Sequence, residues 1–135
     1  MTTNNSETEG LIYNWSNKKI LIAEDEHANF SLIERILLPT KITILHAENG
    51  EEAIKMFMNN QDVNIILMDI RMPEISGVEA TKQIRNINRT VPILALTAFA
   101  LTADEVNALN YGCSDYISKP AKPQYILQKI NEFIK

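Results

Sequence analysis

The 135-residue sequence has a single cysteine, no long apolar run and no excess of positive charge. Because Cys113 has no second cysteine to pair with, no intramolecular disulfide can form, which fits a reducing compartment. The net charge of −4 argues against nucleic-acid binding through a basic face. No stretch approaches the roughly 18–20 apolar residues of a membrane span, and residues 1–10 are polar and acidic, unlike a secretory signal. We therefore expect a cytoplasmic location, without binding to nucleic acid or membrane.

The length suits one compact domain with a substantial core, and the apolar share of 45% is ordinary for a globular protein. Residues 1–17 are mostly polar and are predicted to form a flexible lead-in or linker. Trp15 and the Leu11–Ile12 pair are expected to pack only loosely against the domain. The folded domain is predicted to span residues 18–135.

Strand-like and helix-like patterns alternate along that domain. Strands are predicted over residues 18–23, 41–47, 63–69, 91–97 and 114–118, and helices over residues 28–38, 51–59, 77–86, 103–111 and 124–134. Ser76 and Gly112 are expected to cap the third helix at its start and the fourth at its end. Such alternation predicts an α/β fold, a doubly wound five-stranded parallel sheet with helices on both faces. The expected strand order is the flavodoxin-like 2-1-3-4-5.

The first predicted helix has apolar residues at helical spacing, which we expect to face the core: Ala28, Leu32, Ile33 and Ile36. Phe30 falls roughly opposite this stripe. Two interpretations stay open for it. It faces solvent as an anchor for a partner helix, or it packs against the lead-in near Trp15.

Asp69 is the most informative residue of the sequence because it ends the apolar run of residues 63–68 and precedes a loop marked by Pro73. Glu24 and Asp25 follow the first predicted strand in the same way, Thr97 ends the fourth and Lys119 follows the fifth. In a parallel sheet these positions share one edge, where open α/β folds place their chemistry. Each residue alone has an ordinary structural explanation, but the combination is hard to produce by chance.

The residue types at this edge complement one another chemically. Neighbouring carboxylates repel, and Mg²⁺ resolves this because it prefers oxygen ligands and keeps some waters. Asp25 and Asp69 are the best direct ligands, Glu24 is expected to hold a ligand water, and the backbone carbonyl of Arg71 could add another oxygen. Asp69 could then act as a nucleophile toward phosphorus. The Lys119 ammonium and the Thr97 hydroxyl would bind the oxygens of the transferred group.

These residues resemble the receiver domain of two-component response regulators. The matching segments are Ile20–Glu26, Met68–Pro73, Leu96–Ala98 and Asp115–Pro120. Two further segments, His46–Gly50 and Gly112–Tyr116, are most similar to receivers of hybrid sensor histidine kinases. The resemblance implies a stand-alone receiver or a part of a larger hybrid kinase. It also implies a phosphoacceptor domain rather than a conventional enzyme, one that assists its own phosphorylation and dephosphorylation.

By this resemblance, Asp69 accepts a phosphoryl group from a phosphohistidine of a histidine kinase or a histidine phosphotransfer protein. Glu24 and Asp25 form the acidic pair that binds Mg²⁺. Transfer would switch the surface through which the domain binds its partners in the phosphorelay.

The resemblance also implies a set of switch residues. Thr97 and Lys119 would respond to the phosphoryl group, with Lys119 paired to Asp69 in the resting state. Tyr116 would be the aromatic rotamer switch. The Lys119–Pro120 peptide bond is expected to be cis, which is rare enough to be a specific test.

Three alternative functions fit the residues less well. A flavin-binding flavodoxin needs a phosphate-cradling loop after the first strand, and the acidic residues 24–26 would repel a phosphate. A phosphatase of the haloacid dehalogenase type has a second aspartate two places after its nucleophile, where this chain has Arg71. A receiver-like interaction module that is never phosphorylated usually lacks an acidic residue or the lysine, and neither is missing here.

The sequence also predicts the roles of the two histidines and of two residues near the acceptor. His27 and His46 are interpreted as surface histidines, not as phosphohistidine donors. Arg71 and Phe99 lie two places after Asp69 and Thr97, bordering the path of an attacking water. Because neither offers a carboxylate or amide to orient that water, we expect a moderately long-lived phosphorylated state.

Overall fold

The computed structural model describes residues 13–97, 102–103, 106–107, 110 and 112–134. The strands in these ranges are β1 (Lys19–Ala23), β2 (Thr43–Ala47), β3 (Ile65–Asp69), β4 (Ile93–Thr97) and β5 (Asp115–Ser118). The helices are α2 (His27–Leu37), the 3₁₀ helix η1 (Leu38–Thr40), α3 (Gly50–Asn59), α4 (Gly77–Ile87) and α6 (Pro123–Phe133). Among the described residues, no helix has the length and apolar character needed to cross a bilayer. The predicted helix at 103–111, the Leu11–Ile12 pair and Phe99 lie outside the described residues, wholly or in part.

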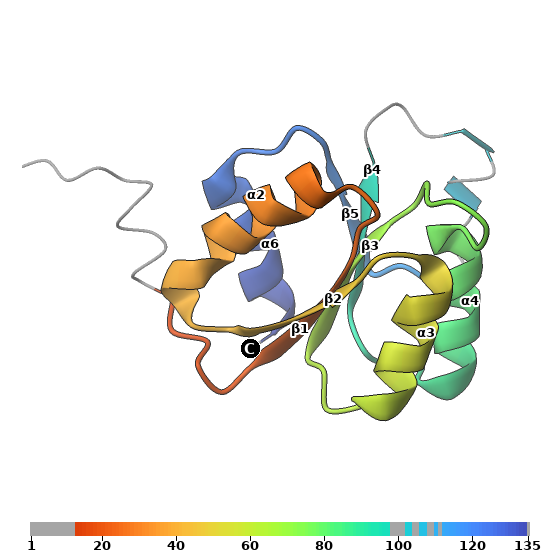
Figure 1. Ribbon diagram of the computed structural model, residues 1–135, viewed down its shortest axis with the longest axis horizontal. Coiled ribbons are helices and arrows are strands. Elements are labelled where there is room, and N and C mark those ends of the chain that lie inside the picture. Colours follow the sequence, from red (N-terminus) through yellow and green to blue (C-terminus); the bar gives the residue numbers. More distant parts are fainter. Residues whose placement is uncertain (1–12, 98–101, 104–105, 108–109, 111, 135) are drawn as a thin grey trace, which may run out of the picture.

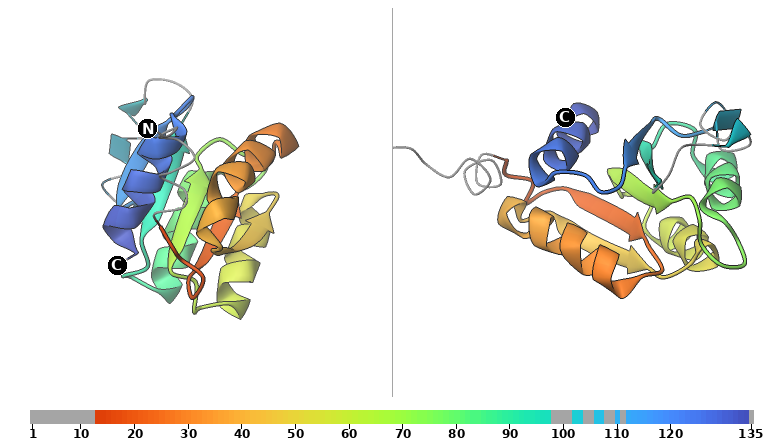
Figure 2. Two further views of the ribbon diagram at one scale, coloured as in Figure 1. Left: turned by 90° about the vertical axis from the view of Figure 1, so that its left-hand side faces the viewer. Right: turned by 90° about the horizontal axis from the view of Figure 1, so that it is seen from above.

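All five strands are parallel and form one sheet in the order β2-β1-β3-β4-β5, which confirms the predicted topology. Helices α2 and α6 cover one face, and α3 and α4 cover the other (Figure 1). The left view of Figure 2 shows α2 and α6 side by side in front of the sheet. Helices on both faces make the sheet doubly wound, as the alternation of patterns predicts.

The inner strands are apolar on both faces because each face is covered by helices. Along β1, Ile20 and Ile22 pack in the core beneath α2 and α6, whereas Leu21 and Ala23 pack in the core beneath α3 and α4. Every residue of β3 and β4 is buried. The carboxyl ends of these strands are therefore fixed by packing on two sides, and the loops that follow them start from defined positions.

Helix α2 presents only half of the predicted stripe to the core, because Ile33 is buried and Ile36 packs partly buried against it, but the other two residues do not. Ile33 and Leu37 are buried, while Leu32 is 54% exposed and Ala28 is also exposed. Phe30 is half-buried and packs against the core beneath α2 and α6, so the first of its two interpretations, a ring that faces solvent, is wrong. The inward stripe runs through Phe30, Ile33 and Leu37, at spacings of three and four residues, which is equally compatible with a helix.

Polar side chains cap the starts of two helices. The Ser76 hydroxyl accepts a hydrogen bond from the Glu79 amide at 3.2 Å, as predicted, and Asn49 caps α3 by accepting from the Glu52 amide at 2.8 Å. Gly112 does not have the left-handed backbone of a C′ glycine. Its role is close packing, because a Cβ there would lie 3.0 Å from side-chain atoms of Thr81 and Arg85 on α4.

Trp15 is a core residue and does not pack loosely. It is 6% exposed, stacks on Tyr13 with ring centroids 5.0 Å apart, and belongs to the cluster beneath α2 and α6. Its amide donates a 2.8 Å hydrogen bond to the carbonyl of Thr40. The packed domain therefore includes Trp15, ahead of the predicted boundary at residue 18.

Candidate functional site

The carboxyl edge of the sheet brings the predicted site residues together. Asp69 ends β3, Thr97 ends β4, and Glu24, Asp25 and Lys119 occupy the first positions after β1 and β5. A pocket of about 200 Å³ opens at this edge, lined by Asp25, Glu26, Asn29, Asp69, Arg71, Leu96, Thr97 and Lys119. Four strand ends that are distant in the sequence thus bring Asp25, Asp69, Thr97 and Lys119 to one small concavity, as the alternation of strands and helices predicts.

The Lys119 ammonium lies between two carboxylates. Its Nζ donates to Glu24 Oε1 at 2.8 Å and lies 3.6 Å from Asp69 Oδ2. The expected ion pair with Asp69 is present, but Glu24 is the nearer partner. Glu24 is fully buried, so its charge depends on this contact.

The surroundings of Asp69 and Glu24 shift the pKa values of these two carboxyl groups in opposite directions. Burial and the neighbouring Glu24 carboxylate raise the pKa of Asp69 to about 7, although Lys119 opposes them. Burial also acts to raise the pKa of Glu24, but the hydrogen bond and charge of Lys119 outweigh it and leave that pKa below its usual value. Burial acts to lower the pKa of Lys119, whereas its carboxylate partners leave it raised. The closer ammonium thus makes Glu24 the more acidic group of the pair.

The loop after β3 holds the Asp69 side chain in place. The Arg71 amide donates a 3.0 Å hydrogen bond to Asp69 Oδ1, and the Gly77 amide donates to the Ile70 carbonyl at 2.8 Å. A Cβ on Gly77 would overlap the backbone carbonyl oxygen of Asp69. Glycine is therefore required for α4 to begin this close to the end of β3.

The acidic residues have the donor set and spacing for a hard cation. One carboxylate oxygen each from Glu24, Asp25 and Asp69 lies within 4.8 Å of the others. Oxygen-only donors with an open pocket beside them fit Mg²⁺, which keeps several of its waters. The Arg71 amide is directed to Asp69, and the role of its carbonyl as a ligand stays a prediction.

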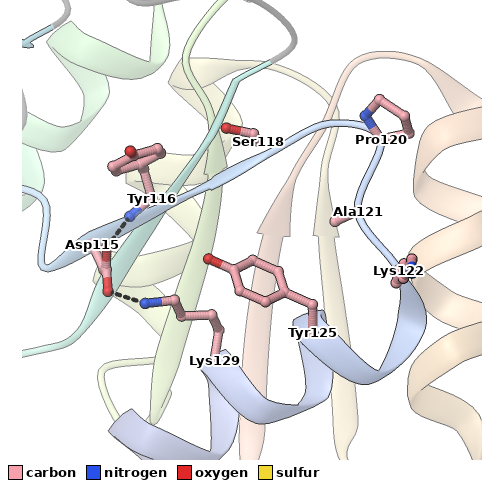
Figure 3. A pocket seen from close by; sticks show the side chains of 8 residues that line it. All are labelled: Asp115, Tyr116, Ser118, Pro120, Ala121, Lys122, Tyr125 and Lys129. Atoms are coloured by element: carbon pink, nitrogen blue, oxygen red, sulfur yellow. Dashed lines mark hydrogen bonds and ion pairs between the residues drawn. The ribbon is translucent and has the colours of Figure 1, made fainter.

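Tyr116 and Pro120 lie beside the site on β5 and the loop after it. Tyr116 is 42% exposed, and Figure 3 shows its ring on the opposite side of β5 from the Asp115 side chain, which pairs with Lys129 on α6 at 2.6 Å. The Lys119–Pro120 peptide bond is cis, as predicted. The Lys119 amide donates to the Thr97 carbonyl at 2.6 Å, which joins the ends of β4 and β5.

Two residues of the pocket were not predicted as site residues, and a histidine outside the pocket differs from its prediction. Glu26 and Asn29 line the pocket and are joined by a 2.9 Å hydrogen bond from Asn29 Nδ2 to Glu26 Oε1. Asn29 lies in the first turn of α2, directly after the acidic loop, and no pattern of the sequence marks it as a site residue. His46 is only half-exposed, and its Nε2 lies 2.9 Å from the Glu24 carbonyl oxygen, so it is not a simple surface histidine.

Comparison with known proteins identifies the family. Residues 20–131 match the response regulator receiver domain family. The chain is 33% identical over 119 residues to the polar-differentiation response regulator DivK of Brucella anthropi, covering 87% of this chain and 96% of DivK. It is also 37% identical over 122 residues to hybrid signal transduction histidine kinase I of Dictyostelium discoideum, covering 84% of this chain but 7% of that kinase. The chain belongs to the receiver domain family of two-component signalling.

Solved structures of receiver domains have the same fold. The receiver domain of a sensor histidine kinase from Pseudomonas aeruginosa, with a magnesium ion coordinated in its active-site cleft, is 35% identical with a TM-score of 0.79, covering 87% of this chain and 97% of that one. A receiver domain of a Saccharomyces cerevisiae response regulator, solved with its histidine phosphotransfer protein, is 33% identical with a TM-score of 0.78, covering 87% and 88%.

Proposed function

We propose that this receiver domain accepts a phosphoryl group on Asp69, in a reaction that requires Mg²⁺, and that phosphorylation changes the surface it presents to partners. The observation that carries the proposal is the Asp69 carboxylate, which lines the pocket close to the Lys119 ammonium and to the carboxylates of Glu24 and Asp25. A lysine and two further acids around one aspartate are typical of a functional site, not of an aspartate with a purely structural role.

The proposed transfer is a displacement at phosphorus. An Asp69 carboxylate oxygen forms a bond to phosphorus while the bond from phosphorus to the donor imidazole nitrogen breaks. The electron pair of the broken bond stays on that nitrogen, and the imidazole, whose other nitrogen carries a proton, leaves as a neutral ring. Lys119 and Thr97 line the pocket beside Asp69, where their ammonium and hydroxyl bind the oxygens of the transferred group.

The side chains of Asp25 and Asp69 and the Arg71 carbonyl would hold the metal directly, with Glu24 acting through a water. The burial of Glu24 and its contact with Lys119 support this indirect role. Bound Mg²⁺ would offset the charge that builds up on the phosphoryl oxygens. The magnesium in the Pseudomonas aeruginosa receiver supports the same choice of ion.

The proposed donor is a histidine kinase or a histidine phosphotransfer protein, which the yeast complex supports. Because Phe30 packs against the core and stacks on His46, the exposed side chain of Leu32 is the better candidate for the docking surface on α2. Leu32 lines an apolar groove of about 340 Å³ between α2 and α6, which also includes Lys119 and Pro120. A partner helix seated in this groove would bring its histidine next to the site. We also propose a cytoplasmic location. Membership of a hybrid kinase is a further part of the proposal, which the Dictyostelium discoideum relative supports.

On phosphorylation, Thr97 and Lys119 would move toward the phosphoryl group, and the exposed ring of Tyr116 would move inward behind Thr97. Register places Tyr116 opposite Ala95 on β4, two residues before Thr97, so the ring lies close enough to follow such a movement. Tyr116, Lys122 and Tyr125 line the same surface pocket (Figure 3). Movement of the Tyr116 ring would therefore change the shape of this pocket.

Acetyl phosphate, a small phosphodonor, tests the acceptor chemistry without a partner protein. We expect wild-type protein and the control Asp115→Asn, an aspartate outside the pocket, to gain one phosphoryl group in Mg²⁺. Asp69→Asn protein, and wild-type protein in EDTA, should gain none. No labelling of wild-type protein in Mg²⁺ would instead favour an interaction module that is not phosphorylated. Equal labelling of all four samples would mean that the modified residue is not Asp69.

A further inference from the structure

His46 on β2 contacts the acidic loop directly. Its Nε2 lies 2.9 Å from the carbonyl oxygen of Glu24, and its ring stacks on Phe30 of α2 with centroids 3.6 Å apart and planes inclined by 4°. A carbonyl oxygen can only accept, so Nε2 carries the hydrogen and donates. One side chain therefore links the strand, the acidic loop and the helix that follows the loop.

The contact lies just past the last paired residues of β1. Pairing of β1 with β2 and with β3 ends at Ala23 on both sides. Beyond it, the Glu24 amide donates to the Ala47 carbonyl at 3.0 Å, and the Glu24 carbonyl accepts from His46. Both backbone groups of Glu24 are thus held by consecutive residues of β2.

The Glu24 carbonyl belongs to the peptide unit that leads into Asp25. Rotation of this unit would change both the direction in which the Asp25 carboxylate leaves the loop and the position of the Glu24 side chain. That side chain is itself fixed at Oε2 by the Glu26 amide at 3.2 Å and at Oε1 by Lys119 at 2.8 Å. The hydrogen bond from His46 to the Glu24 carbonyl adds a contact from β2 to these two side-chain contacts.

The stack with Phe30 determines where the imidazole lies. Rings that are nearly parallel and in contact bury apolar area and restrict rotation of the imidazole. Phe30 is in the first turn of α2, so the ring also ties the start of the helix to β2. His27 approaches the same imidazole edge-on, with ring centroids 6.1 Å apart.

We propose that His46 is a positioning residue that fixes the acidic loop in the geometry for binding Mg²⁺, acting through its hydrogen bond to the Glu24 carbonyl. The inference rests on the proposed function because it concerns the same metal site. By this proposal, part of the affinity of the site for Mg²⁺ depends on His46, a β2 side chain that would contact neither the metal nor the phosphoryl group. Outer partners of this kind commonly change metal affinity by about tenfold or more.

Mg²⁺ titration by calorimetry tests this assignment on three variants of the full chain. His46→Phe keeps an aromatic ring for Phe30 but loses the donor, and it should raise the Kd for Mg²⁺ by about tenfold. His46→Gln places an amide donor near the position of Nε2 and should recover most of the affinity. Ile44→Ala is the matched control, because Ile44 packs on the same face of β2 without reaching the loop. It should lower thermal stability and leave the Kd unchanged.

Wild-type affinity in His46→Phe, or an equal loss in Ile44→Ala, would overturn the assignment. A ¹⁵N spectrum of the wild-type imidazole is independent of whether His46→Phe folds. We expect Nε2 to be protonated and its resonance to shift when Mg²⁺ is added, and an unprotonated or unresponsive Nε2 would contradict the proposal. Wild-type protein that binds Mg²⁺ but is not phosphorylated by acetyl phosphate would overturn the proposed function alone.

Discussion

Lys119 donates to the buried carboxylate of Glu24 at 2.8 Å, a shorter contact than its 3.6 Å approach to Asp69. In this resting arrangement the lysine neutralises the group that has no access to water and leaves Asp69 only partly compensated. A phosphoryl group on Asp69 would bring new negative charge close to the same ammonium. Movement of Lys119 toward it would then weaken the contact with Glu24, which couples the acceptor to the acidic loop.

Removal of the lysine should therefore affect both stability and switching. Lys119→Ala should lower the free energy of unfolding of metal-free protein by about 3 kcal/mol at pH 8, the lower end for an unpaired buried charge, since Lys119 is 21% exposed. The same variant should lose the NMR shift changes that beryllofluoride, a phosphoryl analogue, produces in wild type. Urea unfolding and NMR titration check both effects. Lys129→Ala, which breaks a 2.6 Å pair outside the site, is the control. If Lys119→Ala keeps the full beryllofluoride response, the switch role is wrong.

The raised pKa of Asp69 predicts how Mg²⁺ binding depends on pH. With a pKa of about 7, Asp69 is increasingly protonated as pH falls from 8 to 6, and Mg²⁺ must displace that proton. The Kd for Mg²⁺ should therefore rise toward about tenfold per pH unit below pH 7. Calorimetry at several pH values measures this slope, and a flat profile would contradict it.

The same pKa also fixes the sign of the stability change. Because the folded value exceeds the usual 3.8, the stability contributed by protonated Asp69 is complete below pH 4 and is lost as pH rises through 7. Metal-free Asp69→Asn protein should accordingly be more stable than wild type at pH 8. Equal stability of the two proteins there would argue against the raised pKa.

Leu32 should matter for a protein donor and not for a small one. Leu32→Ala should slow phosphotransfer from a phosphorylated histidine phosphotransfer protein by about tenfold, the effect of losing one apolar anchor. The rate with acetyl phosphate should stay unchanged. Leu38→Ala is the control, because Leu38 is 60% exposed but does not line the groove. Slowing with both donors would indicate a folding defect instead of a lost contact.

The lifetime of the phosphorylated state should depend on the side chains that border the water path. Arg71 is exposed and lines the pocket, and Phe99 lies outside the described residues. Arg71→Asn and Phe99→Asn each introduce an amide that can orient water, and each should speed hydrolysis several-fold over wild type. Decay of the isolated phosphorylated protein in Mg²⁺ measures this, with Arg89→Asn as an exposed control. If neither substitution speeds decay, these side chains do not control access of water.

The sequence predicts the sheet and the strand ends that carry the candidate site, because apolar runs define the buried strands. A run that must be covered on both faces ends where polar residues begin, so Asp69 and Thr97 could be placed at the ends of β3 and β4 without coordinates. The strand order is predicted from the alternation of strand and helix patterns, whereas the cis bond before Pro120 is implied only by the family resemblance, and the structure confirms both.

Contacts between elements were less predictable. On α2, stripes through Leu32 and through Phe30 have similar periodicity, and only packing against the sheet and α6 decides between them. The stack of Phe30 on His46 joins a helix to an edge strand, and no local pattern records it. Trp15 lies in a polar segment, yet its ring is buried by residues from distant parts of the chain.

The central claim is that Asp69 is the phosphoacceptor and that transfer needs Mg²⁺. Borohydride reduction tests it most directly, because it converts an aspartyl phosphate to homoserine and so marks the acceptor. After transfer from a phosphorylated histidine phosphotransfer protein in Mg²⁺, peptide mass mapping should find homoserine at position 69 and at no other aspartate, and none after transfer in EDTA. Homoserine at another position, or at position 69 in the presence of EDTA, would contradict the account.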